Sequence, residues 1–445
     1  MNTDVSPTIE KRVEQLAFTK REKQLEWYRM DNAATVFSFV NSKRITCLFR
    51  ISSELKAPIN VANLQTALDN IMVRFPYYHV NLRRGLFWHF WEKNQQSPKI
   101  VSDSKYPQQK IAITKKGTFP FRVRAFQNRI AVEFHHSLTD GTGAITFLRA
   151  LVGEYLRLQG NKVEDWLDIF RPEQKPELEE YEDAFKKNFQ STIPDPQKTV
   201  HAFHLPDKLE PKGVYHYTTG IIPVKQILEK AKSYNVTLTE YLTAVFLYAL
   251  QSVVYSYPEK KRKRLLKPIR LQVPVNLRRI YPSKTMRNFS LYVTPEINPS
   301  LGEHTFEEII KKVYHYMRSE VTDKVINQQI ARNVRGELNP IVRHIPLFLK
   351  KMAGKMIYNG FGENLYTGVI TNLGKVTMPE PLQEEITDFQ FFPAPSPLTK
   401  TGCAIVSYKD KLYINWGRNI KEASVEKHFF RKLVKEGITV RIETN

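Results

Sequence analysis

The stretch RVRAFQNRIAVEFHHSLTDGTGAITFLRALVGEYLRL, residues Arg122–Leu158, contains the pattern that decides the fold. Two β-prone runs, 121–126 and 129–134, stand on either side of the dipeptide Gln127-Asn128, and this arrangement predicts a β-hairpin. The seven residues HHSLTDG, 135–141, follow where the second strand is expected to end. Two adjacent histidines are therefore predicted at a strand end.

A helix is predicted after these seven residues. Apolar side chains recur at helical spacing between Ile145 and Leu156, and Gly160 ends the run. The dipeptide Asp140-Gly141 supplies a turn between the strand and the helix. A loop at the end of a rigid strand is a common place for a reactive side chain. The histidines are therefore candidates for chemistry.

His136 is the candidate general base. A neutral imidazole has an ordinary pKa of about 6.5 and can accept a proton near neutral pH, so it can activate a hydroxyl or an amine without a serine or cysteine nucleophile. Asp140 lies past a turn, where it is poorly placed to bind the same ring, and we expect it to hold the loop through a cation elsewhere. The alternative interpretation is structural, because histidine pairs occur on ordinary strands and Asp-Gly is a common turn.

Three segments, in this order, carry a resemblance to a known superfamily. They are HHSLTDG, then VPVNLRRIYPSKTMRNFSLYV at Val273–Val293, then TNLGKV at Thr371–Val376. HHSLTDG resembles the HHxxxDG signature of the CoA-dependent acyltransferases, which include chloramphenicol acetyltransferases, plant BAHD enzymes, condensation domains and alcohol acetyltransferases. Over nearly its whole length the chain resembles the bacterial alcohol acetyltransferase-like proteins most. It lacks the DFGWG motif of the plant BAHD enzymes.

The resemblance implies a fold and a reaction. The fold is an α/β structure of two chloramphenicol-acetyltransferase-like lobes, each a mixed open sheet covered by helices, with a channel between them. The reaction moves an acyl group from acyl-CoA, a cosubstrate, to an acceptor, with His136 as general base in the channel. It requires no metal and no permanently bound cofactor.

The resemblance also assigns the supporting residues. In the family the motif aspartate pairs with an arginine near the second segment, which here implies Arg278 rather than Arg279. A buried carboxylate needs such a partner, because an unpaired buried charge is strongly destabilising. Asn288 leads a strand that would line the channel. The predicted site is His136 and Asp140 as its catalytic pair, supported by His135, Gly141, Arg278 and Asn288.

Thr371, Asn372 and Gly374 are candidates for stabilising the developing oxyanion or lining the channel. Gly374 allows close approach of the backbone, and the other two can donate hydrogen bonds. A plain strand-terminating turn explains the same residues. At the level of sequence both interpretations remain open.

The length of 445 residues favours two domains, since single cores rarely grow beyond about 250–300 residues. Hydrophobic residues make up 42% of the chain and charged residues 25%, which is typical of a globular protein. The segment 161–213 is rich in Glu and Pro and loses periodicity. It is predicted to connect an N-terminal lobe, 1–160, with a C-terminal lobe, 214–445.

The cysteines and the N-terminal region indicate a compartment. Cys47 and Cys403 each lie in an apolar run, which favours core thiols in a reducing environment over a disulfide or a metal site. Scattered charges in residues 1–30 exclude the apolar region of a signal peptide, and no apolar run approaches the roughly 18 residues that a membrane span needs. We expect a cytoplasmic protein without a transmembrane segment.

The charge balance favours an anionic partner. The chain has 67 basic and 45 acidic residues, a net charge of +22. Coenzyme A phosphates, an acidic acyl-carrier protein, nucleic acid or an anionic membrane all fit this charge. The run KKRKR, 260–264, is either a patch for such a partner or a solvated loop. Nucleic acid is unlikely as the partner, since no helix-turn-helix, zinc or RNP signature is present.

Other segments give specific expectations. Ser424 is predicted to cap the final helix, and 341–356 to form an amphipathic helix over the channel. The closing sheet of the C-terminal lobe is predicted from the strands 366–372, 386–392, 402–408 and 412–416. A cluster of aromatic residues fits either a substrate-pocket wall or an ordinary core; its members are Phe87, Trp88, Phe90 and Trp91.

The predicted function is transfer of an acyl group, with acetyl the first expectation, from acyl-CoA to a hydroxyl of a small-molecule or lipid-like acceptor. An amine acceptor is the second option. One alternative is a condensation-type enzyme that takes acyl groups from a carrier protein. Another is a non-catalytic binding protein of the same fold, against which the intact His136 argues.

Overall fold

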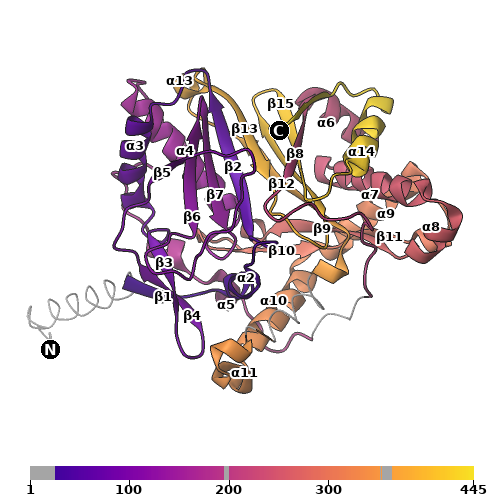
Figure 1. Cartoon of the computed structure of the whole chain (residues 1–445), viewed down its shortest axis with the longest axis horizontal. Helices are drawn as coiled ribbons and strands as arrows, with labels where there is room; N and C mark the ends of the chain where they lie inside the picture. Colours follow the sequence, from indigo (N-terminus) through magenta and orange to yellow (C-terminus); the bar gives the residue numbers. More distant parts are fainter. Residues whose placement is uncertain (1–25, 195–199, 351, 353–362) are drawn as a thin grey trace, which may run out of the picture.

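The fold is that of a computed structural model, which describes residues 26–194, 200–350, 352 and 363–445. In Figure 1 the first part of the chain, in indigo and magenta, forms one lobe, and most of the later part, in orange and yellow, forms the other. Each lobe has an open β-sheet with helices packed on it, which confirms the predicted α/β class.

A five-stranded sheet organises the N-terminal lobe, in the order β13-β2-β7-β6-β5. β6 and β7 form the predicted hairpin, with Phe121 opposite Phe134. The helices α3 and α4 pack on this sheet, and Asn60 caps α3 by accepting a hydrogen bond from the Asn63 N–H at 3.1 Å. The bounds are β2 Leu48–Leu55, β5 Ile100–Ser102, β6 Phe121–Phe126, β7 Arg129–His135, α3 Val61–Arg74 and α4 Gly141–Leu158.

A small three-stranded sheet, β1-β4-β3, lies at the lower end of this lobe in Figure 1. Arg84 pairs with His89 where the β3–β4 hairpin turns. The predicted aromatic cluster divides here, because Trp91 is buried in the core whereas Trp88 is exposed. The bounds are β1 Trp27–Arg29, α2 Asn32–Val40, β3 Val80–Arg84 and β4 His89–Lys93.

The predicted connection, 161–213, packs onto both lobes where it is described. It contains a short 3-10 helix, Leu178–Tyr181, and α5, Ala184–Lys187. Glu180 is buried and accepts two hydrogen bonds from Arg74 of the N-terminal lobe, at 2.6 and 2.7 Å. Such pairing compensates the desolvation of the two charges. Further along, Phe203 is buried in the core of the C-terminal lobe.

An eight-stranded sheet organises the C-terminal lobe, in the order β10-β9-β12-β14-β15-β8-β16, with β11 beside β9. Its main covering helix, α7, is buried around most of its circumference and begins with a capping box of Thr237 and Glu240. The strands are β8 His216–Pro223, β9 Ile269–Asn276, β10 Ser290–Val293, β11 Glu296–Ile297, β12 Gly368–Val376, β14 Thr401–Tyr408, β15 Lys411–Arg418 and β16 Arg441–Thr444. The helices are α6 Val224–Ser233, α7 Leu238–Ser256, α8 Glu259–Leu265, α9 Phe306–Glu320, α10 Asp323–Leu338, α11 Pro340–His344 and α14 Ser424–Lys435. The short helix α13, Glu380–Gln383, lies instead on the N-terminal lobe, with Leu382 in its core.

Strand β13, Ile386–Phe392, corrects the predicted sheet assignment. It lies at the edge of the N-terminal sheet, antiparallel to β2, with Phe391 opposite Ile51, and not in the closing sheet of the C-terminal lobe. Phe389 and Phe391 pack into the N-terminal core. A short apolar strand carries no mark of the sheet that it joins, so periodicity cannot assign it. The chain from 214 onwards therefore contributes to both lobes.

The predicted helix over 341–356 is interrupted. α11 ends at His344, and Ile345-Pro346 separates it from a further helical turn at 347–350. Proline cannot donate the backbone hydrogen bond that a helix interior requires, which explains the break. Residues 351 and 353–356 of the prediction lie outside the described part of the chain.

One open alternative is excluded, and one local expectation is wrong. The KKRKR run is not a loop but forms most of α8, where Glu259 pairs with Lys263 four residues later at 2.7 Å. Ser424 is the first residue of α14 and not its cap; Ala423 occupies that position without a side-chain hydrogen bond. Serine at either position fits the sequence pattern, because assignments of helix ends shift by a residue.

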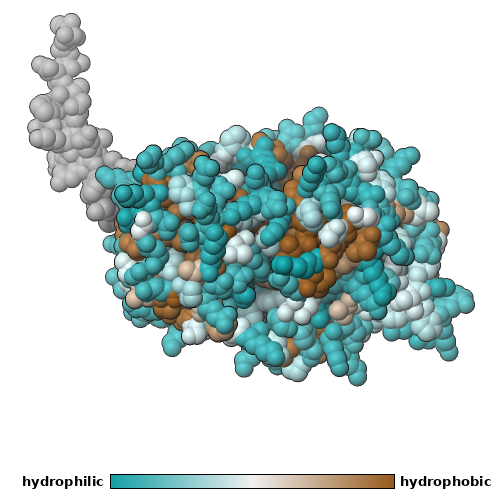
Figure 2. All heavy atoms as spheres, turned by 90° about the horizontal axis from the view of Figure 1, so that it is seen from above, coloured by the Kyte–Doolittle hydropathy of each residue, from teal (hydrophilic) through white to brown (hydrophobic). Residues whose placement is uncertain are grey.

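The length and hydropathy of the helices bear on whether the chain could span a membrane. In the described part of the chain no single helix is both long and apolar enough to cross a bilayer, and only the bent pair α6 and α7, with 83° between them, passes that test together. The view from above in Figure 2 shows a largely hydrophilic face, with its largest hydrophobic area right of centre and smaller ones elsewhere.

Asp388→Asn is expected to stabilise the fold above neutral pH. Asp388 is buried where β13 joins β2, and burial, reinforced by the Glu54 carboxylate, raises its pKa to about 7 against the lowering effects of Gln390 and Arg129. The folded protein thus holds a proton that the unfolded chain, with a pKa of about 4, releases. The free energy of unfolding therefore falls as the pH rises from about 4 to about 7. The variant removes this penalty and gains about 1–3 kcal/mol at about pH 8.

Denaturant unfolding of parent and variant at about pH 5 and about pH 8 measures this difference. Asp410→Asn, at an exposed turn, serves as the control. An equal gain at both pH values, or none at the higher one, would contradict the assigned titration.

Candidate active site around His136

His136 lies at the point where β7 ends, and both lobes hold its backbone. Its N–H donates to the carbonyl of Cys47 at 2.8 Å, which extends the β2–β7 pairing by one residue. Its carbonyl accepts a hydrogen bond from Nδ2 of Asn288 at 2.8 Å, and Asn288 belongs to the C-terminal half of the chain. The position of this histidine therefore depends on the contact between the lobes.

The imidazole of His136 is held between two aromatic rings. Phe37 of α2 stacks on it with 4.8 Å between ring centroids and 20° between planes, and Phe49 lies at 4.5 Å. Burial among these apolar neighbours lowers the pKa of His136 to about 4, although the charge of Asp140 acts in the opposite direction. The ring is therefore neutral at pH 7. Its nitrogens have no hydrogen-bond partner among the described residues, so they are free to accept a proton.

His135 has a different environment. It is fully buried, and its Nδ1 lies 2.7 Å from the Ser137 hydroxyl and accepts a hydrogen bond from the Ser137 N–H at 3.2 Å. An acceptor at Nδ1 places the proton of the neutral ring on Nε2. Burial, followed by the neighbouring His136, lowers its pKa to about 3. His135 therefore stabilises the loop through its hydrogen bonds to Ser137, while the ring nitrogens of His136 remain without hydrogen-bond partners among the described residues.

Asp140 caps α4 and joins it to the C-terminal lobe. Its Oδ1 accepts hydrogen bonds from the N–H groups of Thr142 and Gly143 at 3.1 and 3.2 Å. Its Oδ2 accepts from Nη1 of Arg278 at 2.7 Å and from the N–H of Phe289 at 2.9 Å. The structure thus contains the predicted ion pair.

The guanidinium of Arg278 is fixed from the other side. Nε and Nη2 donate to the carbonyl of Thr285 at 3.0 and 2.8 Å, and Nη2 also donates to the carbonyl of Arg287 at 2.7 Å. These bonds leave Arg278 one orientation toward the carboxylate. Arg279 is exposed, in agreement with the choice made from the sequence.

Two glycines let the loop and helix pack closely. The predicted Gly141 lies against Leu373, whose Cδ1 would be 3.2 Å from an added Cβ. Gly143 was not singled out by the sequence, yet a Cβ there would overlap the hydroxyls of Thr139 and Tyr78. Both hydroxyls lie within hydrogen-bond distance of the Met286 carbonyl, at 2.7 and 2.9 Å. The spacing Asp-Gly-Thr-Gly at a helix start is the only sequence signal for this requirement.

The segment with Thr371, Asn372 and Gly374 lies within β12 and not in a turn that ends it. The strand continues past a β-bulge between Asn372 and Lys375. Asn372 donates to the Thr239 hydroxyl at 3.0 Å and accepts from the Gly374 N–H at 2.9 Å, and Gly374 has φ +88°. No hydrogen bond joins this segment to His136 among the described residues. Its contribution to the oxyanion stays a prediction.

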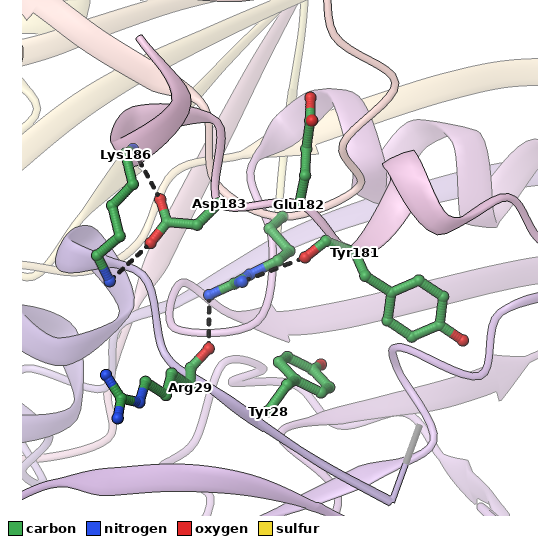
Figure 3. A pocket seen from close by; sticks show the side chains of 7 residues that line it. Tyr28, Arg29, Tyr181, Glu182, Asp183 and Lys186 are labelled. Atoms are coloured by element: carbon green, nitrogen blue, oxygen red, sulfur yellow. Dashed lines mark hydrogen bonds and ion pairs between the residues drawn. The ribbon is translucent and has the colours of Figure 1, made fainter. Parts of the chain in front are cut away.

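A cavity of about 240 Å³ lies between the β1 segment and the connection (Figure 3). Several of its charged groups have partners. Arg287 donates to the carbonyls of Arg29 and Tyr181 at 2.8 and 3.3 Å, and Lys186 pairs with Asp183 at 3.1 Å. These contacts hold the segments around Arg278 together. Across the described residues no group of three or more His, Cys, Asp or Glu side chains is arranged to hold a metal.

One part of the chain matches a family model. Residues 216–401 match the family model described as alcohol acetyltransferase. The predicted resemblance is confirmed. The matched region contains Arg278, Asn288 and the TNLGKV segment, while HHSLTDG lies before it. No curated protein sequence matches the chain.

Solved structures show the same fold over nearly the whole chain. Polyketide synthase associated protein 5 from Mycobacterium tuberculosis matches with a TM-score of 0.56 and 15% identity, covering 92% of this chain and 97% of that one. The TRI3 trichothecene 15-O-acetyltransferase from Fusarium sporotrichioides matches with 0.58 and 10%, covering 92% and 94%. The condensation domain of the monacolin K polyketide synthase MokA matches with 0.55 and 11%, covering 92% and 96%. The chain therefore has the two-lobed fold of condensation domains and acetyltransferases.

Asp140→Asn and Arg278→Ala are each expected to lower both thermal stability and activity, because each leaves a buried charged partner unpaired. The loss is about 3–5 kcal/mol for a fully buried pair and less here, where Arg278 is partly exposed. In a double-mutant cycle the two losses are expected to be strongly non-additive.

Thermal unfolding of the parent, the two single variants and the double variant measures the coupling. Arg279→Ala, next to the pair and exposed, is the matched control and is expected to change little. Additive losses would mean that the ion pair does not hold the loop.

Proposed function

We propose that this protein is an acyltransferase that moves an acyl group, in the first instance acetyl, from an acyl-CoA thioester to a hydroxyl group. The observation that carries the proposal is a neutral imidazole at a strand end, with unpartnered ring nitrogens and a backbone held by both lobes. The alcohol acetyltransferase pattern over 216–401 supports the same reaction class. CoA is a cosubstrate in this proposal and no bound cofactor takes part.

The proposed mechanism uses His136 as base and then as acid. As the acceptor oxygen attacks the thioester carbonyl, a ring nitrogen takes the acceptor's proton and the carbonyl becomes a tetrahedral oxyanion. When the intermediate collapses, the C–S bond breaks and the imidazolium returns the proton to the departing thiolate. The products are the acylated acceptor and free CoA, so atoms and charge balance. Backbone and side-chain donors near Thr371 and Asn372 are proposed to meet the oxyanion.

The surroundings of the imidazole favour an apolar acceptor. Phe37 and Phe49 pack against the ring of His136. An acceptor hydroxyl attached to an apolar body would bury that body against the same rings. We therefore favour a small lipophilic or lipid-like alcohol over a sugar or an amine.

The second candidate is a condensation-type enzyme with a carrier-bound donor, and α8 is the observation that favours it. Lys261 and Lys263 are exposed on this helix, next to further basic residues. An acidic carrier protein would meet such a surface. We prefer free acyl-CoA because the matched family is that of alcohol acetyltransferases.

His136→Ala is expected to reduce acyl transfer by roughly 10²-fold or more, the usual contribution of a positioned general base, without unfolding the protein. The rate of thiol release from acetyl-CoA with a panel of alcohols measures this loss. Because burial lowers the pKa of His136 to about 4, kcat/KM of the parent is expected to stay level from about pH 6 to about pH 8.

His315→Ala, at an exposed histidine on α9, is the matched control and is expected to keep parental activity. If His136→Ala turned over at the parental rate, the base would be another group. Loss of all transfer in the parent itself, with every donor and acceptor, would favour the non-catalytic binding protein.

The donor is decided by steady-state rates with acetyl-CoA and with an acetylated carrier protein. We expect acetyl-CoA to serve as well as or better than the carrier, and Lys261→Glu/Lys263→Glu to leave its kcat/KM within about threefold, since α8 lies on the outer edge of the C-terminal lobe (Figure 1). Lys311→Glu/Lys312→Glu, an exposed pair on α9, is the control for charge reversal. Preference for the carrier by orders of magnitude, lost in the α8 variant alone, would replace this proposal by the second candidate.

A further inference from the structure

An exposed apolar surface surrounds α11 and the turn of the β3–β4 hairpin. Ile341 is 76% exposed, and Phe348 and Met352 are each 68% exposed, although large apolar side chains are usually buried. From the hairpin, Leu86 is 72% exposed and Trp88 is 40% exposed. We call this set, together with Leu349, the α11 surface.

The two parts of the α11 surface are held together by specific contacts. The N–H of Leu347 donates to the carbonyl of Leu86 at 2.9 Å, and Nζ of Lys350 donates to the carbonyl of Phe87 at 2.8 Å. The ring of Phe87 also lies edge-on to His344, with 6.3 Å between centroids. Figure 1 shows α11 projecting at the lower end of the molecule, beside the hairpin. The surface is therefore a fixed feature of the fold and not a loose chain end.

A groove of about 360 Å³ separates the hairpin from α11. It is lined by Phe87 and Trp88 on one side and by Leu338, Pro340, Arg343 and His344 on the other. It has no contact with His136 among the described residues, so the predicted use of these aromatic residues as a wall of the acyl-transfer site is not supported.

The charged residues along α11 and at the tip of the hairpin are basic. The sequence from Leu338 to Met352 contains no Asp or Glu, while Arg343 is exposed and Lys350 is partly exposed. Arg84 is exposed at the hairpin, and the guanidinium of Arg29 lies 5.5 Å from the centre of the Trp88 ring. Exposed apolar side chains are thus flanked by cations with no acidic residue between them along α11.

This combination fits a lipid bilayer better than a protein partner. Segments that lie in the membrane interface place apolar and Trp side chains toward the acyl chains and Lys or Arg at the level of the headgroups. Protein interfaces, by contrast, are depleted in Lys and need a matching surface of about 800 Å² on each partner. Basic side chains next to a bilayer are attracted by anionic lipids.

We propose that the α11 surface docks the protein on an anionic membrane. Ile341, Phe348 and Met352 enter the boundary between headgroups and acyl chains, and Arg343 and Lys350 contact lipid phosphates. The proposal goes beyond acyl transfer and does not depend on it, because its test reads membrane binding alone. It agrees with the absence of a single membrane-spanning helix in the described part of the chain, since interfacial docking needs none.

Vesicle flotation of the full chain tests the proposal. Vesicles of phosphatidylcholine with phosphatidylglycerol are expected to carry the protein up the gradient, and vesicles of phosphatidylcholine alone to carry much less. Ile341→Glu/Phe348→Glu is expected to weaken binding to the anionic vesicles roughly tenfold or more, and Arg343→Glu to weaken it in a salt-dependent way.

Val73→Glu and Leu228→Glu are the matched controls, because both residues are exposed apolar side chains on other helices, α3 and α6. Ile341→Ser/Phe348→Ser provides a milder second pair, and thermal unfolding checks that each variant is folded. Three results would overturn the proposal: no binding of the parent to either vesicle, equal binding of the parent and both α11 pairs, or equal loss in the controls. A fourth result, measured by light scattering, would also overturn it: a concentration-dependent dimer that is lost in both α11 double variants and is unaffected by vesicles. That result would mean that a second copy of the chain binds the α11 surface.

Discussion

The carboxylate of Asp140 receives four hydrogen bonds, and the geometry of the HHSLTDG loop depends on them. Two come from the first turn of α4, which the residue caps, and two come from Arg278 and the Phe289 N–H in the other half of the chain. A carboxylate taken out of water in this way is stable only because each of its oxygens is satisfied. One residue therefore links the helix start, the loop and the other half of the chain.

The same arrangement explains why His136 is suited to proton transfer. Its backbone is bound on one side by Cys47 and on the other by Asn288, so the ring position is set without any bond to the ring itself. Burial against Phe37 and Phe49 keeps the imidazole neutral and its nitrogens available. His135, one residue earlier, uses its own Nδ1 to hold Ser137 and is therefore occupied. Two adjacent histidines thus have separate roles because one faces the interior and the other the solvent-accessible side.

Much of the fold could be predicted from local patterns, and the errors of that prediction have a common cause. The hairpin of β6 and β7, the capped helices α3, α7 and α9 and the pairing of Asp140 with Arg278 follow from spacing, capping residues or family resemblance. The assignment of β13 to the wrong sheet, the aromatic neighbours of His136 and the need for glycine at position 143 were not predictable in this way. Each depends on which segments, distant in sequence, lie side by side, and periodicity holds no information about that.

The sequence alone determined that a histidine and an aspartate stand at either end of a strand-to-helix loop, because strand length, turn residues and helix spacing are local properties. It also determined that acidic residues are absent from the segment that contains α11. Only the tertiary structure decided that β13 completes the N-terminal sheet, that Phe37 covers the imidazole and that the α11 and hairpin side chains form one exposed surface. Burial shifts a pKa, and contacts between side chains define a surface. Burial and contacts both arise when packing brings distant side chains together, and the order of residues does not state which side chains will meet.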